Sequence, residues 1–184
     1  MHFHFGRDGG AERFFVHLID GLAEAGVEQM TVIRPNRVWR ASIEGKTEII
    51  ESHYRNASLD HFTLPKKIRK LAAQWKPDAM IAWTPKGCRL MPSGINSRKI
   101  VRFGDYPRST KRFDNVDLVI TNTPGILERV QSLGWVKPAQ VITNFSTTEK
   151  VAPLDRSTMG IADNAPVVFA SGRFVSIKGF DVLI

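Results

Sequence analysis

The sequence predicts an α/β fold: a Rossmann-like, doubly wound parallel sheet followed by the truncated start of a second Rossmann-like domain. First, short apolar runs alternate with amphipathic segments, which is the rhythm of βαβ units. Second, the chain of 184 residues holds one good-sized domain and leaves little for another. Third, residues 166–184 again have the pattern of an apolar strand that feeds a helix, and a parallel strand needs neighbours.

The first elements are a strand, a glycine-rich turn and a helix. Residues 2–5 alternate in polarity, and Gly9 and Gly10 then allow a sharp turn. Apolar residues recur at helical spacing after the turn, and Gly26 marks the end of the helix. Residues 30–33 supply a second strand, so the chain opens as a βαβ unit.

Two further helices and the remaining strands complete the first domain. An amphipathic helix is expected over residues 64–75, with Thr63 and Pro65 as its start signal. Thr123 and Gly134 bracket another helix. Short apolar runs predict the strands 47–50, 78–83, 99–103, 116–120 and 141–143.

About six parallel strands thus precede a polar stretch at residues 146–158. We therefore predict an N-terminal domain of residues 1–145, and a linker with the start of a second domain in residues 146–184.

Composition narrows the range of partners. The formal net charge of +8 points to something anionic, such as nucleic acid, an acidic membrane surface or a phosphorylated substrate. No nucleic-acid motif or platform of alternating aromatic and basic residues accompanies the charge, so we expect no nucleic-acid partner. Cys88 is the single cysteine, which excludes an internal disulfide framework and a thiolate metal cluster. With no signal-peptide pattern and no long apolar run, we expect a cytoplasmic location.

Two sites could bind phosphate. Gly9 and Gly10 let backbone N–H groups approach a ligand at the start of a helix, although they could equally just make the turn. The order G-R-D-G-G-A departs from a dinucleotide fingerprint, and the second strand ends at Arg34 without a ribose-binding carboxylate. Arg34 could instead contact a 2′-phosphate, which leaves a dinucleotide as an alternative ligand. Arg173 and Lys178 follow the strand expected at residues 167–170 and suit a diphosphate; the alternative is two surface cations.

Three segments, in this order and spacing, resemble family-4 glycosyltransferases with the GT-B fold. These are FGRDGGAERFFVHLIDGLAEAG, FDNVDLVITNTPGILERVQSLGWVKPAQVITNFST and the tail GRFVSIKGFDVLI. The stretch YPRSTKRFDNVDLVITNT is similar to bacterial enzymes that build lipopolysaccharide core or related surface glycans. The resemblance implies two facing Rossmann-like domains, a nucleotide-sugar donor, and transfer with retention of configuration to a glycan or glycolipid acceptor. It implies no metal and no other cofactor.

The resemblance also implies roles for individual residues. Gly9 and Gly10 would face the donor phosphates, and Arg173 and Lys178 would be the catalytic pair that stabilises the diphosphate leaving group. From the residues themselves, Asp8 and Glu12 are expected to contact acceptor hydroxyls, and Arg108, Lys111 and Arg112 near Tyr106 are expected to line an anionic acceptor site. Glu12 is equally explained as a favourable partner of the helix dipole, and each cation as a solvated surface residue.

The chain departs from this family in two ways. Some members carry a sugar-contacting histidine after the strand that corresponds to residues 78–83, where this chain has Trp83 and Thr84. The family's pair of glutamates for the donor sugar and ribose corresponds to no part of the chain. We therefore expect these 184 residues alone to be inactive. The alternative function is a non-catalytic binding module for an anionic glycan, glycolipid or membrane surface.

The helix expected at residues 64–75 carries four cations opposite its apolar stripe: Lys66, Lys67, Arg69 and Lys70. Such a helix suits peripheral attachment to the anionic inner face of the cytoplasmic membrane, where each cation contributes about 1 kcal/mol. In the alternative arrangement the stripe packs on the sheet and the cations face water.

Overall fold

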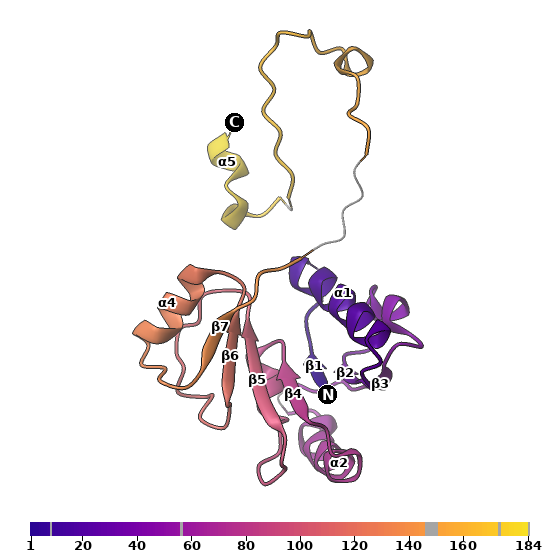
Figure 1. Ribbon diagram of the computed structural model, residues 1–184, viewed down its shortest axis with the longest axis vertical. Helices are drawn as coiled ribbons and strands as arrows, with labels where there is room; N and C mark the ends of the chain where they lie inside the picture. Colours follow the sequence, from indigo (N-terminus) through magenta and orange to yellow (C-terminus); the bar gives the residue numbers. More distant parts are fainter. Residues whose placement is uncertain (8, 56, 146–150, 173, 184) are drawn as a thin grey trace. The chain divides into compact units, whose positions relative to one another are not determined.

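The computed structural model describes residues 1–183 except residues 8, 56, 146–150 and 173. The chain forms two compact units, Met1–Thr147 and Thr148–Ile184. We call the first the sheet unit and the second the C-terminal unit (Figure 1).

The sheet unit contains a seven-stranded sheet in which every described strand pair is parallel, with the order β3-β2-β1-β4-β5-β6-β7. Its strands are β1 (His2–His4), β2 (Met30–Ile33), β3 (Glu48–Glu51), β4 (Ala79–Ala82), β5 (Arg98–Phe103), β6 (Leu118–Thr121) and β7 (Ala139–Val141). The predicted Rossmann-like, doubly wound sheet is confirmed.

Helices lie on both faces of the sheet (Figure 1). They are α1 (Gly10–Glu24), α2 (Leu59–Trp75), α3 (Pro85–Cys88) and α4 (Pro124–Ser132), with the short 3-10 helix η1 (Arg40–Ile43) after β2. The alternation of β1 separates the two cores, because successive side chains of a strand point to opposite faces. Phe3 belongs to the cluster that contains Ile68 of α2, whereas His2 and His4 contact Phe15 of α1.

The structure differs from the sequence prediction at the start of α2. The helix begins at Leu59, five residues before the expected start, and Ser58 is its N-cap residue. Pro65 therefore lies inside the helix, where it cannot donate a backbone hydrogen bond to the preceding turn. The strands predicted in the sheet unit are found, with β3, β6 and β7 shifted by one or two residues along the chain.

The C-terminal unit contains η2 (Arg156–Met159), η3 (Ser176–Lys178) and α5 (Phe180–Leu183). Residues 167–170 form no strand, although the sequence predicts one, and Val168 and Phe169 are 80% and 87% exposed. A strand is held by hydrogen bonds to a neighbouring strand, and the described part of this unit contains no such neighbour.

Candidate functional site

A cavity of about 1030 Å³ lies at the carboxyl ends of β1, β4 and β5. His4 ends β1, Trp83 directly follows β4, and Arg102 is the penultimate residue of β5. The sheet extends through β2 and β3 on one side of β1 and through β4 on the other side. Open parallel sheets bind ligands at such a switch point, outside the carboxyl ends of their strands. The cavity is therefore the candidate functional site.

The imidazole of His4 packs among aromatic rings at the wall of this cavity. Its ring centroid lies 4.7 Å from that of Phe15, 5.2 Å from that of Trp39 and 5.5 Å from that of Trp83, onto which it stacks. Its Nδ1 accepts a hydrogen bond of 3.1 Å from the backbone N–H of Gly6. A neutral imidazole that accepts at one nitrogen carries its proton on the other, so the proton of His4 lies on Nε2.

The Nε2 of His4 is buried and has no hydrogen-bond partner in the part of the chain that the structure describes. Oε1 of Glu12 lies 3.9 Å away. Burial, followed by the charges of Arg102 and Arg37, lowers the pKa of His4 to about 3. The ring is therefore neutral at physiological pH, and its contact with Glu12 is not an ion pair. Burial also lowers the pKa of His2 to about 3.

Glu12 lies in the first turn of α1 and is 8% exposed. Glycines make room for its carboxylate: a Cβ at Gly6 would lie 1.8 Å from Oε1, and a Cβ at Gly9 would lie 3.1 Å from Oε2. Within the described residues, the polar contact recorded for this carboxylate is the 3.9 Å approach to His4. Its acceptor capacity is thus left for hydroxyl groups of a ligand.

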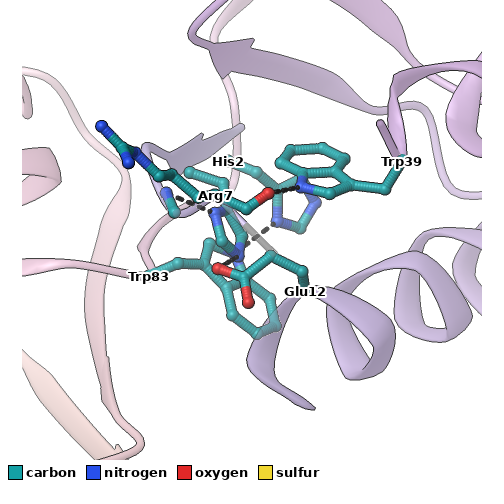
Figure 2. Close-up of polar contacts among 7 residues, drawn as sticks. His2, Arg7, Glu12, Trp39 and Trp83 are labelled. Atoms are coloured by element: carbon teal, nitrogen blue, oxygen red, sulfur yellow. Dashed lines mark hydrogen bonds and ion pairs between the residues drawn. The ribbon is translucent and has the colours of Figure 1, made fainter. Parts of the chain in front are cut away.

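The glycine loop ends at Gly9, which is the N-cap residue of α1, and the helix begins at Gly10. No side chain caps this helix end, and a Cβ at Gly10 would meet nothing within 4 Å. A hydrogen bond from Trp39 holds this loop: its Nε1 donates to the carbonyl of Arg7 over 2.8 Å (Figure 2). Neither glycine lines the cavity, and their role toward donor phosphates stays a prediction.

Arg102 brings a buried cation to the same wall. It is 5% exposed, and its Cζ lies 4.6 Å from the ring centroid of Phe14 and 5.3 Å from that of Trp83. Nη2 donates a hydrogen bond to Oδ1 of Asn144, whereas the buried Nε has no partner among the residues described. Burial lowers the pKa of the guanidinium.

The loop between β5 and β6 supplies the opposite lining of the cavity. Four of the five expected acceptor residues line this one cavity: Glu12, Tyr106, Arg108 and Lys111. Arg112 lines it as well. The fifth, Asp8, lies outside the described residues.

The other predicted site residues lie elsewhere. Arg173 is outside the described residues, and Lys178 ends η3 in the C-terminal unit, where it is exposed. The four cations of the basic helix are exposed on α2. The structure, as far as it is described, has no group of three or more histidine, cysteine or acidic side chains placed to hold a metal ion. None of its described helices combines the length and the apolar character needed to cross a membrane.

Sequence reasoning missed His4 and Arg102. Sequence alone assigns His4 no catalytic role, because a histidine that flanks a strand is expected to be structural or to face solvent. Arg102 was hidden inside the strand expected at residues 99–103. The sequence nonetheless contains an indication of its role. A charged residue near the carboxyl end of a buried strand has to form an ion pair or to bind a ligand.

Two curated proteins match the whole chain. It is 52% identical over 183 residues to the lipopolysaccharide core biosynthesis glycosyltransferase LpsE of Rhizobium meliloti, and covers 54% of that protein. It is 40% identical over 184 residues to the lipopolysaccharide core biosynthesis glycosyltransferase LpsD of the same organism, and again covers 54%. The chain therefore spans about half the length of the curated relatives it matches. No protein-family profile matches it.

The fold is similar to that of a solved protein. The crystal structure of Anabaena HepE in complex with UDP and glucose matches with a TM-score of 0.57 and 15% sequence identity. The match covers 78% of this chain and 44% of the HepE chain. At this identity the likeness concerns the fold alone.

Proposed function

We propose that this chain, which matches two lipopolysaccharide core biosynthesis glycosyltransferases over its whole length, is the acceptor-side part of such an enzyme. The enzyme transfers a sugar, with retention of configuration, from a nucleotide-sugar to a glycan or glycolipid acceptor of the bacterial surface. The chain contributes the acceptor site. The rest of the enzyme, which makes up about half of the relatives' length, contributes the nucleotide pocket.

One observation carries this proposal: a carboxylate to which the described residues donate no hydrogen bond lines a ligand-sized cavity at the switch point of the sheet. Glu12 accepts hydrogen bonds from acceptor hydroxyls, and Tyr106, Arg108 and Lys111 contact the acceptor from the facing loop. Hydroxyl groups of a sugar donate hydrogen bonds, and the two oxygens of a carboxylate accept them.

The donor side of the proposal rests on the sequence resemblance. Gly9 and Gly10 contact the donor phosphates, and Arg173 and Lys178 stabilise the negative charge that develops on the diphosphate leaving group. No metal ion is assigned to this chemistry, because the two cations neutralise the diphosphate.

The experiment is a sugar-transfer assay with nucleotide-sugars and delipidated lipopolysaccharide core oligosaccharide. A chain extended to the length of the curated relatives is expected to transfer sugar, and the 184-residue chain to transfer none, because half of the enzyme is needed for the donor. Turnover by the 184-residue chain, or none by the extended chain with any nucleotide-sugar, would contradict the proposal.

We also propose that the sheet unit attaches peripherally to anionic membranes through the outer face of α2. The apolar stripe of this helix does not insert, since Leu64, Ile68 and Ala72 are packed in the core. The outer face instead begins with Leu59 and Phe62, which are 85% and 67% exposed. Four exposed cations follow them along the helix: Lys66, Lys67, Arg69 and Lys70.

Cosedimentation with vesicles tests this attachment. Replacing the four cations with glutamine is expected to abolish binding to vesicles of phosphatidylglycerol and phosphatidylcholine, since each cation contributes about 1 kcal/mol near an anionic surface. Changing four exposed cations elsewhere on the sheet unit to glutamine, Lys46, Lys86, Arg89 and Arg98, controls for net charge. Equal loss in both variants, or no loss in the first, would refute a specific role for α2.

A further inference from the structure

Arg102 places a buried positive charge in the cavity wall, and the described residues give it no counter-ion. None of the ion pairs recorded among the described residues includes it. The single hydrogen bond recorded for its guanidinium within those residues goes from Nη2 to Asn144, which is neutral, and Nε has no partner. A guanidinium carries five N–H donors, so most of its hydrogen-bonding capacity is unused. Burial of a cation that lacks an ion pair and most of its hydrogen bonds is unfavourable unless a ligand supplies the missing charge and acceptors.

Aromatic rings pack near the guanidinium of Arg102 and leave N–H groups at its edge available to a ligand. The rings of Phe14 and Trp83, at 4.6 and 5.3 Å from Cζ, stabilise the charge through cation–π contact. Aromatic faces do not replace the in-plane hydrogen bonds that the N–H groups make with an oxyanion. Gly104 leaves space beside the edge, because a Cβ there would lie 3.4 Å from Nη1.

The cavity as a whole favours an anion. Among the residues that the structure describes, its lining includes four cationic side chains, Arg102, Arg108, Lys111 and Arg112, against two acidic ones, Glu12 and Asp105. Among the described residues, no ion pair joins Arg102 to either carboxylate. Opposite charges thus line one cavity without neutralising each other. A ligand that carries both hydroxyls and an oxyanion satisfies both kinds of group.

We propose that Arg102 is the anion-binding residue of the acceptor site, and that the acceptor sugar carries a carboxylate or phosphate group. This inference rests on the proposed function, since it names the class of acceptor that the same cavity takes. Either group presents two oxygens to the planar guanidinium fork, while hydroxyls of the same sugar reach Glu12.

A matched set of hexoses tests the inference on the 184-residue chain: glucose, glucuronate and glucose 6-phosphate, with inorganic phosphate as a fourth probe. Dissociation constants are measured by ligand-observed NMR at constant ionic strength. At least one of the two acidic sugars is expected to bind about tenfold or more tightly than glucose, the gain of a charge-assisted hydrogen bond. The tighter of the two identifies the anionic group.

Variants of Arg102 assign the preference to this residue. Arg102→Gln is expected to bring the acidic sugars to the affinity of glucose, and Arg102→Lys to keep part of the preference, because lysine keeps the charge but loses the fork. Arg98→Gln is the matched control, since Arg98 is exposed at the opposite end of the same strand. Thermal melting establishes that each variant is folded. The preference for acidic sugars over glucose is measured on the unaltered chain, so this part of the test does not depend on the folding of a variant.

The possible outcomes distinguish the anionic acceptor from the proposed function on which it rests. Equal binding of glucose and the acidic sugars would overturn the anionic acceptor while leaving the proposed function intact. A preference that survives in Arg102→Gln would move the anion site to other residues. Inorganic phosphate that binds as tightly as glucose 6-phosphate would overturn sugar recognition at Arg102. Failure of all three sugars to bind would overturn both proposals.

Discussion

The free energy of unfolding of the sheet unit is expected to fall by about 5 kcal/mol when the pH drops from 6.5 to 4.5, through the two buried histidines alone. The pKa values of His2 and His4 are lowered by burial from 6.5 in the unfolded chain to about 3 in the folded protein. Between these values the unfolded chain binds more protons than the folded protein. The stability is therefore fully present above pH 6.5 and is lost as the pH falls, at about 1.4 kcal/mol per pH unit for each histidine.

Urea unfolding at a series of pH values measures this dependence. In His4→Gln the slope of the unfolding free energy against pH, measured between pH 4.5 and 5.5, is expected to decrease by about 1.4 kcal/mol per pH unit. The reason is that unfolding of this variant takes up one proton fewer. His53→Gln is the control, because His53 is exposed and lies outside the cavity. A slope that His4→Gln leaves unchanged would mean that His4 is not held neutral by burial.

Gly6→Ala is expected to weaken the binding of core oligosaccharide by the 184-residue chain about tenfold or more, although it leaves every atom of Glu12 in the protein. The added Cβ would lie 1.8 Å from Oε1 of Glu12 and 2.7 Å from Cε1 of His4. The flexible carboxylate has to turn away from the cavity, and its charge-assisted hydrogen bonds to acceptor hydroxyls are lost. The rigid His4 ring also has to shift, which costs about 1 to 3 kcal/mol of folding free energy.

Isothermal titration with core oligosaccharide measures the change in affinity, and urea unfolding measures the change in stability. Gly21→Ala is the matched control, because Gly21 lies within α1 and a Cβ there would meet nothing within 4 Å. This control is expected to keep full affinity and to gain some stability, since alanine favours a helix. Unchanged oligosaccharide affinity in Gly6→Ala would contradict the placement of Glu12 at the acceptor.

The sequence was sufficient to predict the layout of the sheet unit. Apolar runs bounded by turn residues are typical of buried parallel strands, so the strands at residues 30–33 and 99–103 were located within a residue. The start of α2 was misplaced because Pro65 has the pattern of a first-turn residue, whereas Ser58 begins the helix a turn and a half earlier. Sequence alone also predicts a strand at residues 167–170, but a strand forms only where a partner is available.

The candidate site was predicted in part. Glu12 and the cations of the loop after β5 were expected at an acceptor, and the structure brings them to one cavity. His4 and Arg102 were missed, because their significance depends on residues that are distant in the chain: the rings of Trp39 and Trp83 around His4, and the lack of a counter-ion for Arg102 among the residues described. Such relations join residues up to about a hundred positions apart, so no local pattern records them.

The central claim is that the cavity beside Glu12 holds the acceptor, and the rate of sugar transfer tests it most directly. In a chain extended to the length of the curated relatives, Glu12→Gln is expected to lower kcat/KM for the acceptor about tenfold to a hundredfold, the effect of losing a charged hydrogen-bond acceptor. Glu24→Gln, at the exposed far end of the same helix, is expected to transfer at the unaltered rate. Transfer by Glu12→Gln that equals that of Glu24→Gln would contradict the account.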